Sequence, residues 1–214
     1  MLEQMFSINK VVPVVVVNDV DKCIKLSETL LESGINTMEV TLRTDNALEI
    51  LRKISQDIPE MVLGAGTILS KEHFNDACDA GAKYIISPGV TNELLTTAQN
   101  NLSKVKYIPG ICTPSQAMDA ANAGFNYVKF FPAEAYNAQA VIKALSSPLP
   151  HIKFCPTGGV TLDNMSNYLK LPNVFAVGLS SIVESNLIEA GDFIEIRRRC
   201  EQAVATVNNI FNKG

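Results

Sequence analysis

The sequence predicts an α/β protein built as a single (β/α)8 TIM barrel. Short apolar runs alternate with longer amphipathic segments from one end of the chain to the other. The apolar runs recur roughly 20–26 residues apart, as βα units with short loops require. No linker, low-complexity stretch or change in composition divides the 214 residues. We therefore expect one barrel domain over residues 1–214, with a short N-terminal helix and a C-terminal helix.

The strands are predicted from the apolar runs and the helices from the segments between them. The eight predicted strands are 11–17, 37–42, 61–66, 84–87, 106–111, 126–131, 153–156 and 174–178. Apolar residues at helical spacing predict helices over 22–31, 47–54, 71–80, 93–100, 115–122, 138–145 and 162–169.

Three predicted helices end in the same way, with a glycine two or three positions before the next strand. These are Gly34, Gly81 and Gly124. A helix C-terminus favours glycine because it needs a residue in the left-handed conformation. The alternative fold is a doubly wound open sheet, but no Gly-x-Gly-x-x-Gly turn follows the first strand. The barrel is therefore the favoured fold.

Charge and hydropathy exclude several kinds of partner. The net charge of −4 gives no electrostatic reason to expect nucleic acid or an anionic membrane. The N-terminus lacks the basic start and apolar core of a signal peptide, and the run 11–17 is too short to span a bilayer. We expect a cytoplasmic protein. Arg197, Arg198 and Arg199 are expected on a solvated or oligomer-facing surface, in preference to an RNA site.

Cysteine and histidine give no sign of a metal site. The five cysteines are odd in number, scattered and without a CxxC pair, at Cys23, Cys78, Cys112, Cys155 and Cys200. This usage is typical of small buried hydrophobes in a reducing cytosol. His73 and His151 stand apart from any ligand pattern. The sequence predicts no metal.

Lys129 is the strongest functional candidate. It lies inside an apolar, aromatic-rich run, 127–132, that predicts a buried strand ended by a proline. Burial disfavours a charged ammonium, and a neutral amine condenses with ketones and aldehydes to form a Schiff base. Strand alternation places Lys129 on the same face as Tyr127 and Phe131, away from the helices. It should therefore point to the barrel axis.

Glu39 and Arg43 supply the acidic and cationic groups near the same end of the barrel. Met38 and Val40 fit the helix-facing side of their strand, which directs Glu39 and Thr41 to the axis. Glu39 is either a structural partner of a buried cation or a general acid/base, and a Schiff-base lysine favours catalysis because that chemistry needs proton transfers. Arg43 lies in the following loop, where its planar guanidinium suits a carboxylate. A surface arginine is the alternative.

Loops at the carboxyl ends of the strands are the usual functional face of a barrel. The small residues of 64–67 allow a ligand to approach the backbone, and Thr67 can donate a hydrogen bond. Residues 87–89 are best explained as a rigid turn. The loops 157–161 and 178–181 follow the seventh and eighth strands and should open helices, which is typical of a phosphate site. Plain turns are the alternative.

Six motifs, in order over nearly the whole chain, resemble one family. They lie at 39–44, 64–67, 86–89, 109–110, 129–134 and 155–159. The run Lys-Phe-Phe-Pro-Ala-Glu at 129–134 is highly specific. The chain resembles the bacterial aldolases that cleave 2-dehydro-3-deoxy-6-phosphogluconate and 4-hydroxy-2-oxoglutarate. The resemblance implies a role in carbohydrate metabolism, in the Entner–Doudoroff pathway.

The resemblance implies a class I aldolase that works as a homotrimeric barrel without metal or organic cofactor. Its substrate would be a small 2-keto acid, cleaved to pyruvate and either glyceraldehyde 3-phosphate or glyoxylate. Lys129 would form the Schiff base with pyruvate, and Glu39 would shuttle protons. The pyruvyl part would contact Arg43, Thr67, Pro88 and Phe131. Thr157 would read the stereochemistry of the substrate hydroxyl, and the phosphate would bind at Gly158, Gly159, Gly178 and Ser180.

One departure from the family pattern concerns the phosphate. Many members have Gly-Gly-Ser-Trp where this chain has Gly178-Leu179-Ser180-Ser181. Leu179 should add bulk that narrows the loop, and Ser181 replaces an aromatic wall with a donor.

Two other functions stay open from the residues alone. One is a phosphate-binding isomerase or synthase that uses acid/base chemistry, and the other is a non-catalytic metabolite-binding barrel.

Overall fold

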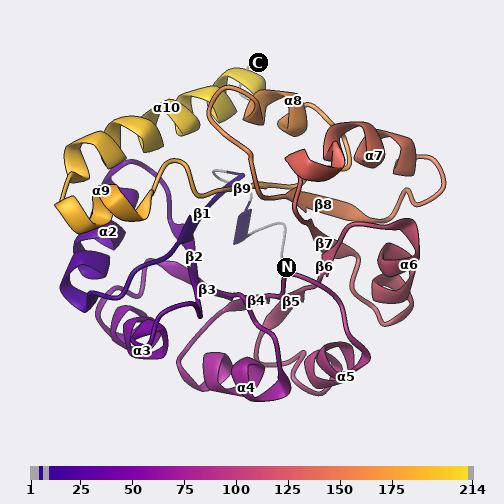
Figure 1. Ribbon diagram of the computed structural model, residues 1–214, viewed down its shortest axis with the longest axis horizontal. Coiled ribbons are helices and arrows are strands. Elements are labelled where there is room, and N and C mark those ends of the chain that lie inside the picture. The colour runs from indigo at the N-terminus through magenta and orange to yellow at the C-terminus, as the bar shows by residue number, and fades with distance from the viewer. Residues whose placement is uncertain (1–4, 7–9, 212–214) are drawn as a thin grey trace.

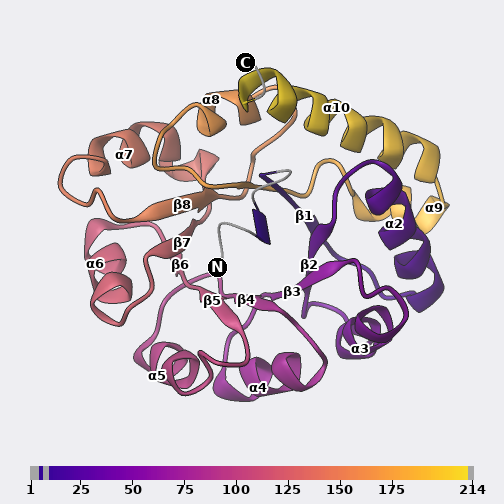
Figure 2. The same ribbon diagram turned by 180° about the vertical axis from the view of Figure 1, so that it is seen from behind.

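The structure is a computed structural model that describes residues 5–6 and 10–211. It is an α/β fold with a parallel sheet that forms a half-barrel, and the helices lie outside the strands (Figure 1). The view from behind shows the same arrangement (Figure 2). Most of the predicted N-terminal helix falls outside the described residues. The α/β prediction is confirmed.

The strands pair in parallel in two sheets. In chain order they are β1 (Val11–Val15), β2 (Thr37–Thr41), β3 (Val62–Gly66), β4 (Tyr84–Ile86), β5 (Lys106–Ile108), β6 (Gly110–Ile111), β7 (Tyr127–Phe130), β8 (Lys153–Pro156) and β9 (Val177–Leu179). The six-stranded sheet has the order β5-β4-β3-β2-β1-β9, and the three-stranded sheet has the order β6-β7-β8. Two isolated parallel bridges, Phe154 with Val174 and Thr157 with Gly178, connect the β8 segment to the β9 segment.

The helices alternate with the strands along the chain. They are α2 (Val20–Glu32), α3 (Ala47–Asp57), α4 (Lys71–Asp79), α5 (Asn92–Asn100), α6 (Pro114–Asn122), the 3-10 helix η1 (Glu134–Tyr136), α7 (Ala138–Leu145), α8 (Met165–Leu169), α9 (Ser185–Ala190) and α10 (Phe193–Phe211). Side chains cap the starts of four of these helices, α2, α4, α5 and α6: Asp19, Ser70, Thr91 and Thr113 each accept a hydrogen bond from a backbone N–H three residues on. Gly34, Gly81 and Gly124 have φ of 83°, 96° and 95°, which confirms the predicted left-handed helix ends.

Some predicted boundaries were wrong. The predicted strand 106–111 is two strands, β5 and β6, because Pro109 between them has no N–H for the ladder. The predicted helix 162–169 begins only at Met165. Asn164 accepts a hydrogen bond from the backbone N–H of Thr161 and donates one to the Gly159 carbonyl, so the chain forms a turn there first.

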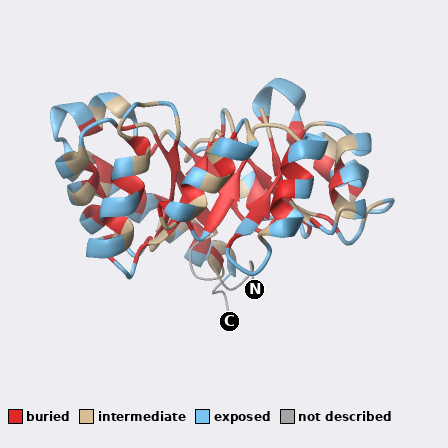
Figure 3. Cartoon of the chain, turned by 90° about the horizontal axis from the view of Figure 1, so that it is seen from below, coloured by how far each residue is buried: buried red, intermediate tan, exposed pale blue. Residues whose placement is uncertain are grey.

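Alternate strand residues belong to two separate apolar clusters. The larger cluster packs between strands and helices and includes Val128 and Phe130 of β7. The smaller one contains alternate residues such as Tyr84 and Ile86, with Tyr127 packed against it. In Figure 3 the buried residues concentrate on the strands and on the helix faces turned toward them. The predicted alternation in β7, which separates Lys129 from the helix side, is confirmed.

All five cysteines are free thiols; three are buried, and Cys78 and Cys112 are half-buried. Within residues 5–6 and 10–211, no helix has both the length and the hydropathy needed to cross a membrane. Across the same residues, no three His, Cys, Asp or Glu side chains gather as they would around a metal ion.

Candidate active site

The structure brings Lys129 and Glu39 into contact. Lys129 on β7 donates a hydrogen bond from Nζ to Oε1 of Glu39 on β2, at 3.2 Å. The two side chains are only 5% and 1% exposed. Burying a charged group costs free energy unless a group of opposite charge pairs with it. Each of these side chains therefore lowers the cost of burying the other. The carboxylate is also close enough to exchange a proton with the amine directly.

Two glycines of β3 make the space that Glu39 and Tyr84 occupy. A Cβ at Gly66 would overlap the Glu39 carboxylate, and a Cβ at Gly64 would overlap the Tyr84 ring. Tyr84 shares a 2.9 Å hydrogen bond with Thr37 through its hydroxyl, and burial raises its pKa well above the usual value. Protein side chains fill the space that a Cβ would take at both glycines, and the approach of a ligand to the backbone of 64–67 stays a prediction.

Neutral groups complete the surroundings of Lys129. The amine lies 5.4 Å from the centre of the Phe131 ring, within range of a cation–π interaction. Cys155 of β8 is directly opposite Lys129 in the strand register. Burial raises the pKa of the Cys155 thiol to about 12; Lys129 opposes this rise and Glu39 adds to it. The thiol is therefore protonated at neutral pH and places no second negative charge beside the amine.

Arg43 and Thr67 meet at the carboxyl ends of β2 and β3. The Nε of Arg43 donates a hydrogen bond to Thr67 Oγ1 at 2.9 Å, although Arg43 is exposed. Thr67 has φ of 60°, a conformation that non-glycine residues seldom adopt. Such backbone outliers are concentrated at ligand sites. The contact holds the Nε of Arg43 beside the strand ends.

Pro88 and Phe131 also lie at strand ends, and both are half-buried. A Cβ at Gly110 would overlap the Pro88 backbone, so the turn after β4 packs directly on the neighbouring strand. The prediction of a rigid turn at 87–89 agrees with the Ser87 hydroxyl, which donates to the Gly89 carbonyl at 2.6 Å.

The two candidate phosphate loops lie next to each other. Thr157 forms an isolated bridge with Gly178, and a Cβ at Gly178 would overlap the Thr157 hydroxyl. Gly158 and Gly159 have φ of 95° and 81°. Successive residues with unusual φ can direct backbone N–H groups toward an anion. The expectation that each loop opens a helix directly was wrong, since α8 begins at Met165 and α9 at Ser185.

Leu179 does not narrow the phosphate loop as expected. It is fully buried in the large apolar cluster, on the helix side of β9. Strand alternation explains this, because Gly178 takes the opposite face. Ser180 is exposed, and Ser181 is half-buried.

Glu134 and Tyr168 have no predicted role in the sequence, but Glu134 contacts the Gly158–Gly159 loop and Tyr168 contacts Glu134. Tyr168 of α8 donates a short hydrogen bond to the Glu134 carboxylate, and the Glu134 backbone N–H donates to the Gly158 carbonyl at 3.0 Å. A Cβ at Gly159 would lie 2.6 Å from Glu134 Cγ, which is too close. Glu134, held by Tyr168, therefore packs directly against the Gly158–Gly159 loop. Only the position of Glu134 in the 129–134 motif signals it in the sequence.

A buried amine in contact with a buried carboxylate, on two strands of parallel sheets, can carry out Schiff-base chemistry with proton transfer. This is the arrangement that a class I aldolase needs. Residues 2–199 match the family described as KDPG and KHG aldolase, and the chain belongs to that family. The resemblance found in the sequence is confirmed.

Individual relatives agree over almost the whole chain. A 2-dehydro-3-deoxy-phosphogluconate aldolase from Pseudoalteromonas atlantica is 40% identical over 203 residues, which cover 95% of this chain and 94% of the relative. A KHG/KDPG aldolase from Escherichia coli is 37% identical over 202 residues, 94% of each chain. The KDPG aldolase of Legionella pneumophila, crystallised with pyruvate captured at low pH as a covalent carbinolamine intermediate, has a TM-score of 0.91 at 38% identity; the match covers 95% of this chain and 98% of that one.

Proposed function

We propose that this chain cleaves 2-dehydro-3-deoxy-6-phosphogluconate to pyruvate and glyceraldehyde 3-phosphate, or 4-hydroxy-2-oxoglutarate to pyruvate and glyoxylate. The observation that carries the proposal is the buried contact between Lys129 and Glu39. The names of its relatives include both substrates.

The reaction begins when the Lys129 amine attacks the C2 carbonyl of the keto acid. The resulting carbinolamine loses water to form an iminium, which withdraws electrons from the adjacent carbon. Glu39 takes the proton of the C4 hydroxyl as the C3–C4 bond breaks, and the aldehyde leaves. The electron pair of the broken bond moves into the iminium, which becomes an enamine. A proton is then returned to C3. Water adds to the iminium carbon, pyruvate leaves, and the amine is free again.

Arg43, Thr67, Pro88 and Phe131 bind the pyruvyl part in this proposal. The Arg43–Thr67 hydrogen bond supports it, because it keeps the guanidinium beside the strand ends, where a substrate carboxylate would bind. A carboxylate fixed there sets the direction of C2 toward Lys129. Such fixation accelerates the reaction mainly by orienting the reactants.

The phosphate of the larger substrate binds in this proposal at Gly158, Gly159, Gly178 and Ser180. Support comes from the positive φ angles of Gly158 and Gly159 and from the bridge that joins the two loops. Thr157 is buried directly after β8, the strand paired with the Lys129 strand, and its hydroxyl donates to the Cys155 carbonyl. From there it reads the substrate hydroxyl at the reacting carbon.

A single, fully closed (β/α)8 barrel domain is the architecture that suits this site. In that arrangement β5 and β6 are two halves of one strand, broken at Pro109, and the two isolated bridges join β8 to β9. Assembly as a homotrimer and a place in the cytoplasm stay predictions. Sedimentation equilibrium of the purified protein measures the first of these.

Reductive trapping tests the proposed function. Borohydride is added in the presence of pyruvate, and the modified lysine is located by peptide mass mapping. We expect the adduct on Lys129 in the native chain and in a Lys153→Ala control, which changes a lysine at the start of the neighbouring strand. An adduct on another lysine, or none, rejects the assignment. Acid/base catalysis without a Schiff base predicts no adduct, and a non-catalytic barrel predicts no pyruvate release from either substrate.

A further inference from the structure

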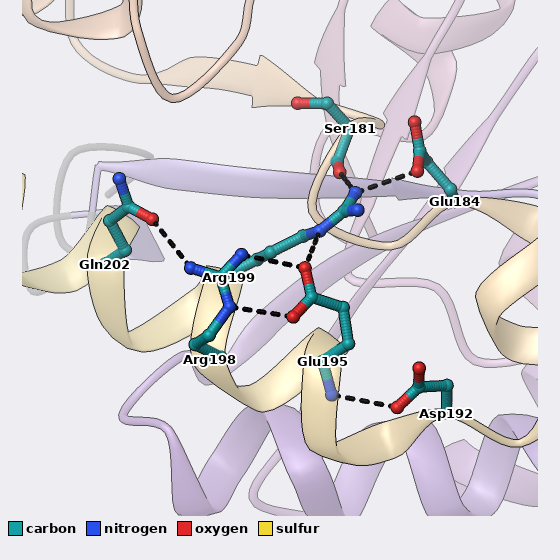
Figure 4. Close-up of polar contacts among 7 residues, drawn as sticks. All are labelled: Ser181, Glu184, Asp192, Glu195, Arg198, Arg199 and Gln202. Carbon is teal, nitrogen blue, oxygen red and sulfur yellow. Dashed lines mark hydrogen bonds and ion pairs between the residues drawn. The ribbon is translucent and has the colours of Figure 1, made fainter.

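Arg199 differs from the two arginines beside it on α10. Its side chain is 23% exposed, whereas those of Arg197 and Arg198 are 44% and 62% exposed. Figure 4 shows that Arg199 reaches from the helix to the loop that follows β9. Arg199 is therefore the least exposed of the three, and the solvated or oligomer-facing surface stays a prediction for this cluster.

Three acceptors hold the Arg199 guanidinium in place. Nη1 donates to the backbone carbonyl of Ser181 at 2.6 Å and to Oε2 of Glu184 at 2.8 Å. Nε donates to Oε1 of Glu195 at 2.8 Å. Hydrogen bonds between charged groups are stronger than neutral ones, and a planar guanidinium loses little freedom for each bond it forms. Arg199 thus ties the loop after β9 to α10.

Glu195 provides the fixed end of this connection. Hydrogen bonds from Arg198 and then Arg199 lower the pKa of the Glu195 carboxyl to about 2. It is therefore ionised at any physiological pH. Arg198 binds Glu195 and also lies 3.4 Å from Gln202 on the same helix, but these contacts stay within α10 (Figure 4).

The loop held by Arg199 carries Ser180 of the proposed phosphate site. Gly178 and Leu179 belong to β9 on one side of Ser180, and Ile182 and Val183 are buried on the other. The Val183 backbone N–H donates to the Ser180 carbonyl at 3.1 Å, which makes a tight turn. The Arg199 bond to the Ser181 carbonyl is one residue beyond Ser180. This hydrogen bond therefore restrains the segment that follows Ser180, which is outside β9.

We propose that Arg199 is a positioning residue for phosphate recognition: it fixes the Ser180 loop and neutralises Glu184 beside it. This inference rests on the proposed phosphate site. The Nε and Nη1 donors of Arg199 are taken by protein acceptors, so these groups hold the loop and are not offered to a phosphate. Without Arg199, the Glu184 carboxylate would stand unpaired near the loop and repel a phosphate.

The test compares Arg199→Ala with Arg198→Ala, a matched control that removes the neighbouring arginine and leaves the loop contact intact. The KM for 2-dehydro-3-deoxy-6-phosphogluconate and the rate of borohydride trapping with pyruvate are measured for each. Losing the charged contacts should raise the KM for the phosphorylated substrate about tenfold in Arg199→Ala. Trapping should not change, because pyruvate has no phosphate. Arg198→Ala should match the native chain in both measurements.

Two further variants make the result decisive. Arg199→Lys keeps a charge near Glu184 without the planar guanidinium, so its KM should lie between those of the native chain and Arg199→Ala; it also covers the case in which the alanine variant does not fold. Ser180→Ala tests the phosphate site directly. A normal KM in Ser180→Ala overturns the site assignment. A raised KM in Ser180→Ala with a normal KM in Arg199→Ala overturns only the role of Arg199. If pyruvate trapping in Arg199→Ala falls by as large a factor as the KM for the phosphorylated substrate rises, that result also overturns the role of Arg199.

Discussion

Glu39 and Lys129 lie 90 residues apart in the chain and meet at 3.2 Å, with almost no exposure to solvent. The two groups reach each other across the interior, from β2 and β7. The carboxylate accepts a hydrogen bond from the amine, so the two groups can exchange a proton directly. The chemistry of both residues is therefore coupled, and a change in one should be measurable through the other.

The Glu39→Gln substitution separates proton transfer from covalent capture. The amide keeps the size of the side chain but cannot accept the substrate proton. We expect kcat for aldol cleavage to fall roughly 10²–10⁴-fold, the usual contribution of a general acid or base. Borohydride trapping with pyruvate should be largely retained, since Lys129 is still present. Unchanged cleavage would remove Glu39 from the mechanism.

The Gly66→Ala substitution should disable the site without changing a polar group. The added methyl would occupy the space of the Glu39 carboxylate, which must then move away from Lys129. We expect kcat to fall toward that of Glu39→Gln, and overpacking to lower the free energy of unfolding by about 1–3 kcal/mol. Gly89→Ala is the matched control, because a Cβ there meets no atom within 4 Å. Equal activities of the two variants would contradict the role given to Gly66.

The Arg43→Ala substitution tests recognition of the keto acid. Loss of the guanidinium should raise the pyruvate concentration needed for half-maximal trapping about tenfold, as expected for a lost charged hydrogen bond. Arg43→Lys should recover little, because lysine cannot present two parallel N–H groups to a carboxylate. Arg52→Ala, at an exposed position of α3, should behave as the native chain does. Normal trapping by Arg43→Ala would show that Arg43 does not bind the keto acid.

The buried Cys23 thiol predicts a loss of stability at alkaline pH. Burial raises its pKa to about 12 in the folded protein, whereas an unfolded thiol titrates near pH 8.5. Between these pH values the folded state therefore binds more protons than the unfolded state. The contribution of the protonated Cys23 thiol to the free energy of unfolding is complete below about pH 8.5 and declines above it. The free energy of unfolding is measured by urea for the native chain and for Cys23→Ala at pH 7.5 and 9.5. Between these pH values the native chain should lose about 1 kcal/mol of stability relative to the variant. A difference that does not change with pH would contradict this.

Local periodicity is enough to predict much of the fold and the direction of the two catalytic candidates. A strand alternates its side chains every residue, so the apolar neighbours of Lys129 and Glu39 determine which face each one takes. The glycines at three helix ends were predicted for a similar reason, because the backbone angle needed there depends on one residue. These inferences concern a few consecutive residues, and the structure agrees with them.

Contacts across the fold could not be predicted in this way. The space beside Gly64 and Gly66 is filled by Tyr84 and Glu39, because the register between β2, β3 and β4 places those side chains over the glycines. Strand register and pairing depend on the packing of the whole sheet, to which each short segment contributes little. The same limit explains why the burial of Leu179 on the helix side was missed.

The sequence by itself determined that strands and helices alternate, that Lys129 and Glu39 turn away from the helices, and that the chain resembles one family of aldolases. The tertiary structure alone decided that these two side chains touch, that the two glycine loops lie together, and that Arg199 holds one of them. Periodicity constrains the direction of a side chain through its nearest neighbours in the chain. The distance between residues from separate strands is the result of the packing of the whole molecule.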